Sequence, residues 1–448
     1  MESVFNWLAA QPDLVQATIR VLLLVGFILT IVPGCIWWER RLLSWMQDRI
    51  GPNITGTITL PDSFPVKPLA GKKIRTFGLL QPIADGVKLF LKEDITPNTV
   101  DRFVYFIAPA VALFPAFALG ATLPWAPHYG PLSLLSPVAD VNVGVLYVMA
   151  ISSLGVYGVV LAGYASNNKY SLLGGLRSSA QLISYELSMG MSLAAVVTAV
   201  GSLKMTEMVR YQEGPLWGVI PGLQNWFVLT PFGLVAAAIF LICMVAETNR
   251  APFDLPEAEN ELIAGYHTEY SSMKFAVFFM GEYAAMLVFS GIFTAVFLGG
   301  YNPLPISWSG IAAANPGFAG LSAFTDGLVY WLGPVWFFAK VVFVFSGFIW
   351  LRATLPRLRY DQLMNLGWKS LLPLAVANFM VVGIWVLGTK LYGVWGGWLA
   401  WLCATAILVL LYITYLRASR KGLEGQLGTR SITLVDPKPR SVEMEGGQ

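Results

Sequence analysis

Charged side chains are scarce in this sequence. Only 12% of its 448 residues are Asp, Glu, Lys or Arg, whereas 56% are apolar. A soluble domain is about 25% charged, so this chain has too little polar surface to remain in water. Its 16 tryptophans suit a protein with two water–lipid interfaces, where such amphipathic rings are enriched. The composition excludes an ordinary soluble domain and indicates a polytopic membrane protein.

Cysteine and histidine are also few. Cys35, Cys243 and Cys403 stand singly in apolar runs, and the two histidines are His128 and His267. The sequence has no Cys-x-x-Cys pair, no Cys/His cluster and no Gly-rich phosphate loop, so it contains no recognisable zinc, iron–sulfur or nucleotide motif. We interpret the cysteines as small buried hydrophobes. We predict that this chain binds no cofactor, so any redox chemistry belongs to another subunit.

Long apolar runs are abundant. A helix that crosses a bilayer needs about 20 mostly apolar residues, because lipid offers no hydrogen-bond partner to exposed backbone groups. The sequence therefore predicts an all-α integral membrane protein with about nine transmembrane helices. The candidate spans are 14–38, 103–123, 142–165, 180–201, 232–248, 273–298, 330–351, 371–390 and 395–416.

Lysine and arginine are distributed unevenly between the connecting segments. Segments 39–102 and 352–369 and the tail after 417 are rich in both, whereas 124–141 and 299–329 contain neither. Basic loops remain on the cytoplasmic side of a membrane. The pattern predicts an N-terminus outside and a C-terminus in the cytoplasm, which is the parity that nine spans require.

Segment 78–94 carries too many charges to cross a membrane. Its apolar residues recur at helical spacing on one face: Leu80, Ile83, Val87, Phe90 and Leu91. Its polar residues occupy the opposite face: Gln81, Asp85, Lys88 and Lys92. This period predicts an amphipathic helix at the cytoplasmic interface, although a surface helix packed on its own protein has the same pattern. The preceding stretch 54–77 has no periodicity, and we interpret it as an exposed loop.

Acidic residues gather between positions 247 and 283. Against only Arg250 and Lys274, this stretch holds Glu247, Asp254, Glu257, Glu259, Glu261, Glu269 and Glu282. In a crowded group, the ionisation of one carboxylate raises the pKa of its neighbours, so several can hold protons near neutral pH. Protons can then pass between them without a large energy gap, as a proton path requires. The alternative is a solvated acidic loop, over about 247–272, that docks a basic partner.

Three carboxylates lie in or beside apolar runs, namely Glu186, Glu247 and Glu282. A carboxylate at the bilayer centre costs about 2.5–3.5 kcal/mol and persists mainly where it lines a polar cavity or takes up a proton. Glu186 follows Ser184 and Tyr185, which are possible hydrogen-bond partners. The alternative role for this residue is therefore a structural hydrogen bond that helps helices to pack. Together with the acidic loop, the three predict a proton path.

Three arginines follow the seventh predicted span: Arg352, Arg357 and Arg359, in the motif Arg-Ala-Thr-Leu-Pro-Arg-Leu-Arg. Cytoplasmic topology alone accounts for basic residues at this place. They are also suited to face the acidic loop as counter-charges.

Several motifs between about residue 10 and about residue 390 carry a resemblance to a known family. They are Glu39-Arg-Arg with Gln47-Asp-Arg-Ile-Gly-Pro-Asn53, Gln81-Pro-Ile-Ala-Asp-Gly-Val-Lys-Leu-Phe90, 168–177, Gln181-Leu-Ile-Ser-Tyr-Glu186, 247–283 and 352–362. Together they resemble one membrane subunit of proton-pumping respiratory complex I, NADH:quinone oxidoreductase. It is known as the H subunit in bacteria and as subunit 1 in mitochondria.

The resemblance implies a role beside a quinone chamber. Members of this family admit quinone, the substrate, sideways from the bilayer towards an iron–sulfur cluster held by peripheral subunits. The resemblance assigns a proton-linked chain to Glu186, Glu247, Asp254, Glu257, Glu259, Glu261, Glu269 and Glu282. It places near the quinone tunnel Arg40, Arg41, Arg250, Arg352 and Arg357, to which we add Arg359. NADH, FMN and the iron–sulfur clusters are expected in partner subunits.

The resemblance also sets the expected organisation. Residues 1–390 are expected to form the membrane domain with eight spans, and 391–448 to add a ninth span and a basic cytoplasmic tail. The partners are other complex I membrane subunits and the peripheral subunits with the quinone head-group site, and the location is the bacterial plasma membrane. Family members pass almost directly from Gly-Pro-Asn to Gly-Leu-Leu-Gln, whereas here 54–77 intervenes.

Two alternative functions remain open at this point. One is the same scaffold in an ion-pumping hydrogenase or in a complex fed by another electron donor. The other is a stand-alone cation/proton antiporter, although no pair of broken helices in corresponding halves marks a midplane ion site.

Overall fold

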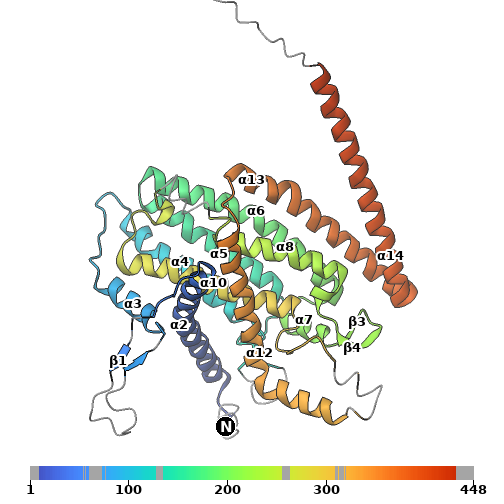
Figure 1. The fold of residues 1–448 in the computed structure, drawn as a ribbon, viewed down its shortest axis with the longest axis horizontal. Helices are drawn as coiled ribbons and strands as arrows, with labels where there is room; N and C mark the ends of the chain where they lie inside the picture. The colour runs from blue at the N-terminus through green and yellow to red at the C-terminus, as the bar shows by residue number, and fades with distance from the viewer. Residues whose placement is uncertain are drawn as a thin grey trace, which may run out of the picture.

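Helices dominate the chain (Figure 1). The computed structural model describes residues 10–53, 55, 57–59, 73–75, 77–127, 135–254, 263–307, 311, 317 and 319–429. Among these residues, seven helical stretches are long and apolar enough to cross a membrane. They lie in α2 (Asp13–Met46), α4 (Arg102–Gly120), α5 (Gly144–Ala165), α6 (Lys169–Val200), α10 (Ser272–Phe297), α12 (Ala319–Thr354) and the run Tyr360–Thr414. A shorter apolar helix is α8 (Pro231–Glu247).

These helices confirm the predicted class, an all-α membrane protein. Each predicted span falls almost wholly within one of them, but the spans 371–390 and 395–416 share a single run, α14 (Leu372–Thr429). That run is interrupted at Gly393, whose φ of 76° is non-helical and suits a residue without a Cβ. In Figure 1 the chain changes direction within α14, and its last part rises away from the other helices.

Short elements connect the long helices. They are α3 (Gln81–Leu91), α7 (Met205–Gln212), α13 (Tyr360–Asn365), the 3-10 turns η3 (Phe227–Leu229) and η4 (Gly265–His267), and the π-helical turn η6 (Leu366–Leu371). The helix α3 lies inside the predicted amphipathic segment 78–94. Within the stretch that we interpreted as a loop, β1 (Thr57–Thr59) pairs antiparallel with β2 (Lys73–Arg75). A second small antiparallel sheet joins β3 (Pro215–Leu216) to β4 (Ile220–Gln224).

Polar residues start several of these helices. Asp101 precedes α4 and accepts a hydrogen bond of 3.4 Å from the backbone N–H of Val104. Thr230 precedes α8, accepts from the N–H of Gly233 at 3.2 Å, and is followed by a proline at the first helical position. Such residues satisfy backbone N–H groups that have no partner inside the helix.

The alternation of helix direction brings one set of helix termini together. The helices α2, α5, α8 and α12 finish, and α4, α6, α10 and α14 begin, at what we call the acidic end of the bundle. Bonds between distant segments close this end: the N–H of Asp101 donates to the carbonyl of Ala165 at 3.2 Å, and the N–H of Ile95 donates to Oγ of Ser271 at 2.9 Å. The connecting loops that contain most of the predicted site residues therefore meet at the acidic end.

Candidate functional site

The candidate site begins at Glu39, near the end of α2. Glu39 is only 5% exposed, although it carries a carboxylate. Arg352, near the end of α12, donates to its Oε1, and the Tyr283 hydroxyl of α10 donates to its Oε2 at 2.6 Å. Both oxygens thus have partners, as a buried charge requires.

Arg250 extends this arrangement to a second carboxylate. It follows α8 and is 7% exposed. Its guanidinium carbon lies 4.4 Å from the ring centroid of Tyr283, and its Nη2 lies 3.6 Å from Oε2 of Glu282. A planar guanidinium can stack on an aromatic face and still attract a carboxylate. Tyr283 and Arg250 therefore connect the Glu39–Arg352 pair to Glu282.

Glu282 receives further partners from the turn η4. The Tyr266 hydroxyl donates to its Oε1 at 2.9 Å, and Nε2 of His267 lies 3.7 Å from the same oxygen. This turn is fixed to α6, because Ser171 donates from its hydroxyl to the carbonyl of Tyr266 at 3.3 Å. Glu282 consequently faces a phenol, an imidazole and a guanidinium at once.

A small cavity of about 80 Å³ lies beside Glu282. Its lining includes the side chains of Glu282, Glu247, Asn249 and Ser152. Ser152, on α5, in turn donates a hydrogen bond of 3.4 Å to Glu186 of α6. Most of the cavity lining is apolar, but with these polar side chains in it the cavity can hold water, which can bridge groups that lack a direct hydrogen bond. It thus brings the three carboxylates of the apolar helices into one neighbourhood.

Glu247, the last residue of α8, differs from its neighbours. Its Oε2 is buried and has no hydrogen-bond partner among the described residues. The backbone around it is held firmly, because Nε2 of Gln181 donates to the carbonyls of Ala246 and Phe253, each at 2.8 Å. A buried carboxylate oxygen without a donor is costly unless it holds a proton or meets water. Glu247 is therefore a residue of the cavity lining with a buried carboxylate oxygen that no described donor satisfies.

Two more predicted carboxylates lie towards the surface of the acidic end. Asp254 accepts from Arg357 at 2.6 Å, and the nearby loop is closed by the N–H of Leu358 donating to the carbonyl of Pro252 at 3.1 Å. Glu269 accepts from the side-chain amide of Asn168 at 2.7 Å. These pairs join the acidic loop to the segment after α12 and to the start of α6.

Tyr270, just before α10, packs beside Glu269. Its ring stacks on that of Tyr105, with centroids 4.2 Å apart. Burial, together with the neighbouring Tyr105, raises the pKa of the Tyr270 phenol well above its usual range. Tyr270 therefore remains protonated, and its hydroxyl donates to the carbonyl of Tyr105 at 3.3 Å.

The amphipathic helix α3 borders the acidic end. Its Asp85 pairs with Arg40 of α2 at 2.6 Å, and the Ser272 hydroxyl at the start of α10 donates to the carbonyl of Leu89 at 2.8 Å. The apolar face of α3 is left open: Ile83, Val87, Phe90 and Leu91 are 59%, 52%, 71% and 77% exposed. In Figure 1 this helix lies beside α2, at the edge of the bundle.

The predicted residues divide into groups in the structure. Glu186, Glu247 and Glu282 surround or adjoin one cavity, and Arg250 and Arg352 belong to the network that reaches it. Asp254 pairs with Arg357, and Glu269 lies apart, beside Asn168. Arg40 and Arg41 face α3 and the segment near Pro52, and Arg359 directly precedes α13. Glu257, Glu259 and Glu261 lie outside the described residues.

Sequence reasoning missed Glu39 as a site residue. The buried residues of α2 are Ile28, Val32, Cys35 and Glu39, and their spacing of three and four places all of them on one helix face. This period was readable in the sequence and would have placed Glu39 inside the bundle. Tyr266, His267 and Tyr283 were also missed, and only the folded arrangement brings them to Glu282 and Glu39.

Comparison with known proteins identifies the family of this chain. A family model described as NADH dehydrogenase matches residues 19–383. The chain is 44% identical over 374 residues to the NADH-quinone oxidoreductase H subunit numbered 1 of Geobacter metallireducens, covering 82% of this chain and 95% of the relative. It is 45% identical over 383 residues to the H subunit of Thermomicrobium roseum, covering 83% and 96%. It is 44% identical over 387 residues to the H subunit numbered 2 of Koribacter versatilis, covering 83% and 97%. With its membrane helices and these matches, the chain belongs to the NADH dehydrogenase family, in which it is a homologue of the H subunit of NADH-quinone oxidoreductase.

Proposed function

We propose that this chain is the membrane subunit of a proton-translocating NADH:quinone oxidoreductase. In that role it forms much of the chamber through which quinone enters, and it links quinone reduction to a path of carboxylates. The observation that carries the proposal is the continuous arrangement from Arg352 and Glu39 through Arg250 and Glu282 to the cavity beside Glu247.

The quinone side of the proposal rests on α3 and the basic residues near it. Reduction of a quinone consumes protons as well as electrons, and a quinone tail needs an apolar route from the bilayer. The open apolar face of α3 offers such a route at the acidic end. Arg40 and Arg352 border the same region through their partners Asp85 and Glu39, and Arg357 lies near it with Asp254.

The proton side of the proposal rests on the cavity. Glu282 and Glu247 line it, and Glu186 is reached through Ser152. A change of charge at Glu39 or Arg352 would alter the electrostatic potential at Glu282. Arg250 lies between them, and buried charges interact strongly over short distances in a medium of low polarity. Glu257, Glu259 and Glu261 would extend this path within the acidic loop.

The remaining parts of the enzyme belong to partner subunits. The peripheral subunits would carry NADH, FMN, the iron–sulfur clusters and the quinone head-group site, while other membrane subunits would receive the coupling. We place the chain in the bacterial plasma membrane, with its N-terminus outside and its C-terminus in the cytoplasm. Residues 1–390 would form the membrane domain shared with relatives, and 391–448 an addition to it.

A pair of variants at Glu247 tests the proposal in the assembled complex. Gln matches Glu in shape but cannot take up a proton, whereas Asp can. We expect Glu247→Gln to lower NADH-driven proton uptake into inverted vesicles while NADH oxidation by an artificial acceptor persists, and Glu247→Asp to retain part of the uptake. Normal proton uptake per NADH in Glu247→Gln would contradict the proposed path.

A further inference from the structure

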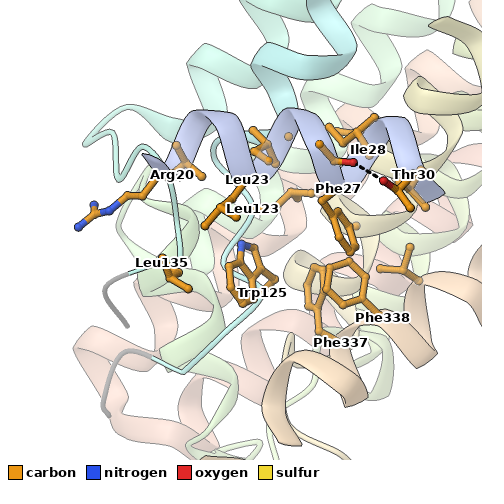
Figure 2. A pocket seen from close by; sticks show the side chains of 18 of the residues that line it. Arg20, Leu23, Phe27, Ile28, Thr30, Leu123, Trp125, Leu135, Phe337 and Phe338 are labelled. Carbon is orange, nitrogen blue, oxygen red and sulfur yellow. Dashed lines mark hydrogen bonds between the residues drawn. The ribbon is translucent and has the colours of Figure 1, made fainter. Parts of the chain in front are cut away.

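A second, much larger cavity lies at the opposite end of the bundle from Glu39. It has a volume of about 610 Å³, within the range of about 300–1,000 Å³ that ligand sites occupy. Figure 2 shows it between α2 and α12, with Phe27 facing Phe337 and Phe338, and with Trp125 and Leu123 closing another side. Almost all of its lining is apolar. Water would be a poor occupant, because apolar cavities of this kind remain dry.

The length of the cavity along α2 matches the thickness of one leaflet of a bilayer. Its lining on this helix runs from Arg20 to Thr30, which is about 15 Å at 1.5 Å per residue. The hydrocarbon core of a bilayer is about 30 Å thick, so the lining spans one leaflet. Arg20 and Glu39 are about 28 Å apart by the same measure. Thr30, the lining residue of α2 nearest to Glu39, is about 14 Å from it by the same measure, so the Arg20 end of the cavity is the part that lies far from the proposed quinone route.

A polar chamber adjoins the apolar one at Arg20, which lines both. This chamber has a volume of about 300 Å³ and also includes Lys204, Arg210, Asp140 and Glu207. Lys204 pairs with Asp140 at 3.1 Å, and Arg210 pairs with Glu207 at 3.1 Å. In Figure 2 the Arg20 side chain points away from the apolar lining.

Arg20 is the cation of this chamber that lacks a carboxylate partner among the described residues. Its Nη2 donates to the neutral side chain of Gln16 at 3.1 Å, and its Nε is buried without a hydrogen-bond partner. The lining of the chamber thus has three cations and two carboxylates. A partly buried guanidinium with a free donor favours a phosphate, which it can bind with two parallel hydrogen bonds.

We propose that these two chambers form one site for an anionic glycerophospholipid. An acyl chain fills the apolar cavity beside α2, and the phosphate lies in the polar chamber against Arg20. The lipid covers the N-terminal half of α2, where Leu22 and Leu23 are 66% and 54% exposed, and fixes this helix against α12. A quinone fits the site less well, because its head group has no negative charge to offset Arg20.

Two glycines of α2 provide a matched pair of variants. A Cβ added at Gly26, which lines the cavity, or at Gly34, which does not, would meet no other atom within 4 Å. Gly26→Leu therefore places a larger apolar side chain at the cavity, beginning from a Cβ that has open space around it, and Gly34→Leu makes the same change elsewhere on the helix. At the head-group end, Arg20→Gln removes the charge and Arg20→Lys retains it.

The test uses the assembled complex, purified in mild detergent and reconstituted into nanodiscs of phosphatidylcholine. Phosphatidylglycerol with a photoreactive acyl chain is added, and the labelled peptides are identified by mass spectrometry. We expect labelling of residues 22–30 and 337–341 that unlabelled phosphatidylglycerol competes away. Arg20→Gln should lower it by about tenfold, the effect of losing one charge-assisted bond. Gly26→Leu should also lower it. Arg20→Lys, which keeps the charge but not the two parallel hydrogen bonds, should lower it less than Arg20→Gln, and Gly34→Leu should leave it unchanged.

Three results would overturn the proposal. Labelling displaced by a long-tailed quinone and not by phosphatidylglycerol would make the cavity a quinone site. Equal labelling in Arg20→Gln and in the unaltered chain would exclude recognition of the phosphate. Absence of label from both peptides in complexes that assemble normally on a native gel would mean that a protein segment fills the cavity.

Discussion

The Tyr283 hydroxyl donates a hydrogen bond of 2.6 Å to Oε2 of Glu39, across 244 positions of the sequence. The other oxygen of Glu39 pairs with Arg352, so one buried carboxylate joins α2, α10 and α12. The ring of Tyr283 also receives the guanidinium of Arg250, the partner of Glu282. A change in charge at Glu39 therefore has a short physical route to the cavity carboxylates.

Variants of Glu39 and Tyr283 test this route. Glu39→Gln leaves Arg352 without its carboxylate, whereas Tyr283→Phe removes a single hydrogen bond to a charged group, worth about 1.5–3 kcal/mol. We expect both to lower the quinone reductase rate of the assembled complex, and Glu39→Gln to lower it more. The double variant Glu39→Gln, Arg352→Gln should lose less quinone reductase activity than the two single variants predict together, because it removes both charges of the pair. Strict additivity would contradict a direct coupling.

Arg357 tests the quinone side of the site. Replacing it with Ala removes a cation at the acidic end and the ion pair of 2.6 Å that it forms with Asp254. The ion pair is partly exposed, so its loss should cost no more than about 1 kcal/mol of stability. We expect slower quinone reduction, while NADH oxidation by an artificial acceptor at the peripheral subunits persists. Equal loss of both activities would indicate failed assembly and not a role beside quinone.

A third prediction concerns the packing of α4 against α5, which supplies one wall of the small cavity. A Cβ added at Gly158 would lie 2.6 Å from Cα of Ala112, whereas one at Gly155 would meet only Pro115, at 3.9 Å. Gly158→Ala should therefore destabilise the fold by about 1–3 kcal/mol, the usual cost of overpacking. Gly155→Ala is the matched control, with little effect expected. The measurement is the midpoint of thermal unfolding of the purified complex, and equal midpoints for both variants would contradict the observed close approach.

Hydropathy was sufficient to predict the helices, because lipid imposes a length and an apolar composition on every span. The charges were harder to interpret. Glu39 is adjacent to Arg40 and Arg41, and a cytoplasmic loop that is rich in basic residues accounts for this charged group even if none of its side chains is buried. Only the helical period with Val32 and Cys35 indicates that Glu39 faces the interior. In this part of the sequence, charged residues that indicate the cytoplasmic side of the membrane therefore lie directly beside a buried residue of the candidate site.

Contacts within the acidic end could not be read from the sequence. Tyr266 and His267 reach Glu282 only because the turn η4 rests on α6, through the bond from Ser171. The short strands β1 and β2 were also missed, since three residues are too few to show an alternating pattern. The position of η4 depends on a bond to a residue 95 positions away, which no local pattern reveals.

The last prediction separates a proton path from an acidic docking loop. Glu282 lines the small cavity, and Glu186 reaches it through Ser152. Gln preserves the hydrogen-bonding shape of each side chain but cannot carry a proton. Since positioned proton-transfer groups contribute roughly 10²–10⁴-fold to rate, we expect Glu282→Gln and Glu186→Gln each to lower proton uptake by about tenfold or more. Glu261→Gln, in the acidic loop, is expected to change proton uptake in the same direction.

A docking loop would behave differently under the same measurements. Exposed ion pairs are worth about 0.2–1 kcal/mol, so neutralising one carboxylate would weaken assembly slightly, and the complexes that remained would pump normally. Complex content on a native gel, quinone reductase rate and proton uptake should therefore be measured on the same membranes. Asp13→Asn is the control, because Asp13 is exposed in the first turn of α2, away from the acidic end. Normal assembly, turnover and pumping in both Glu186→Gln and Glu282→Gln would remove these residues from the path.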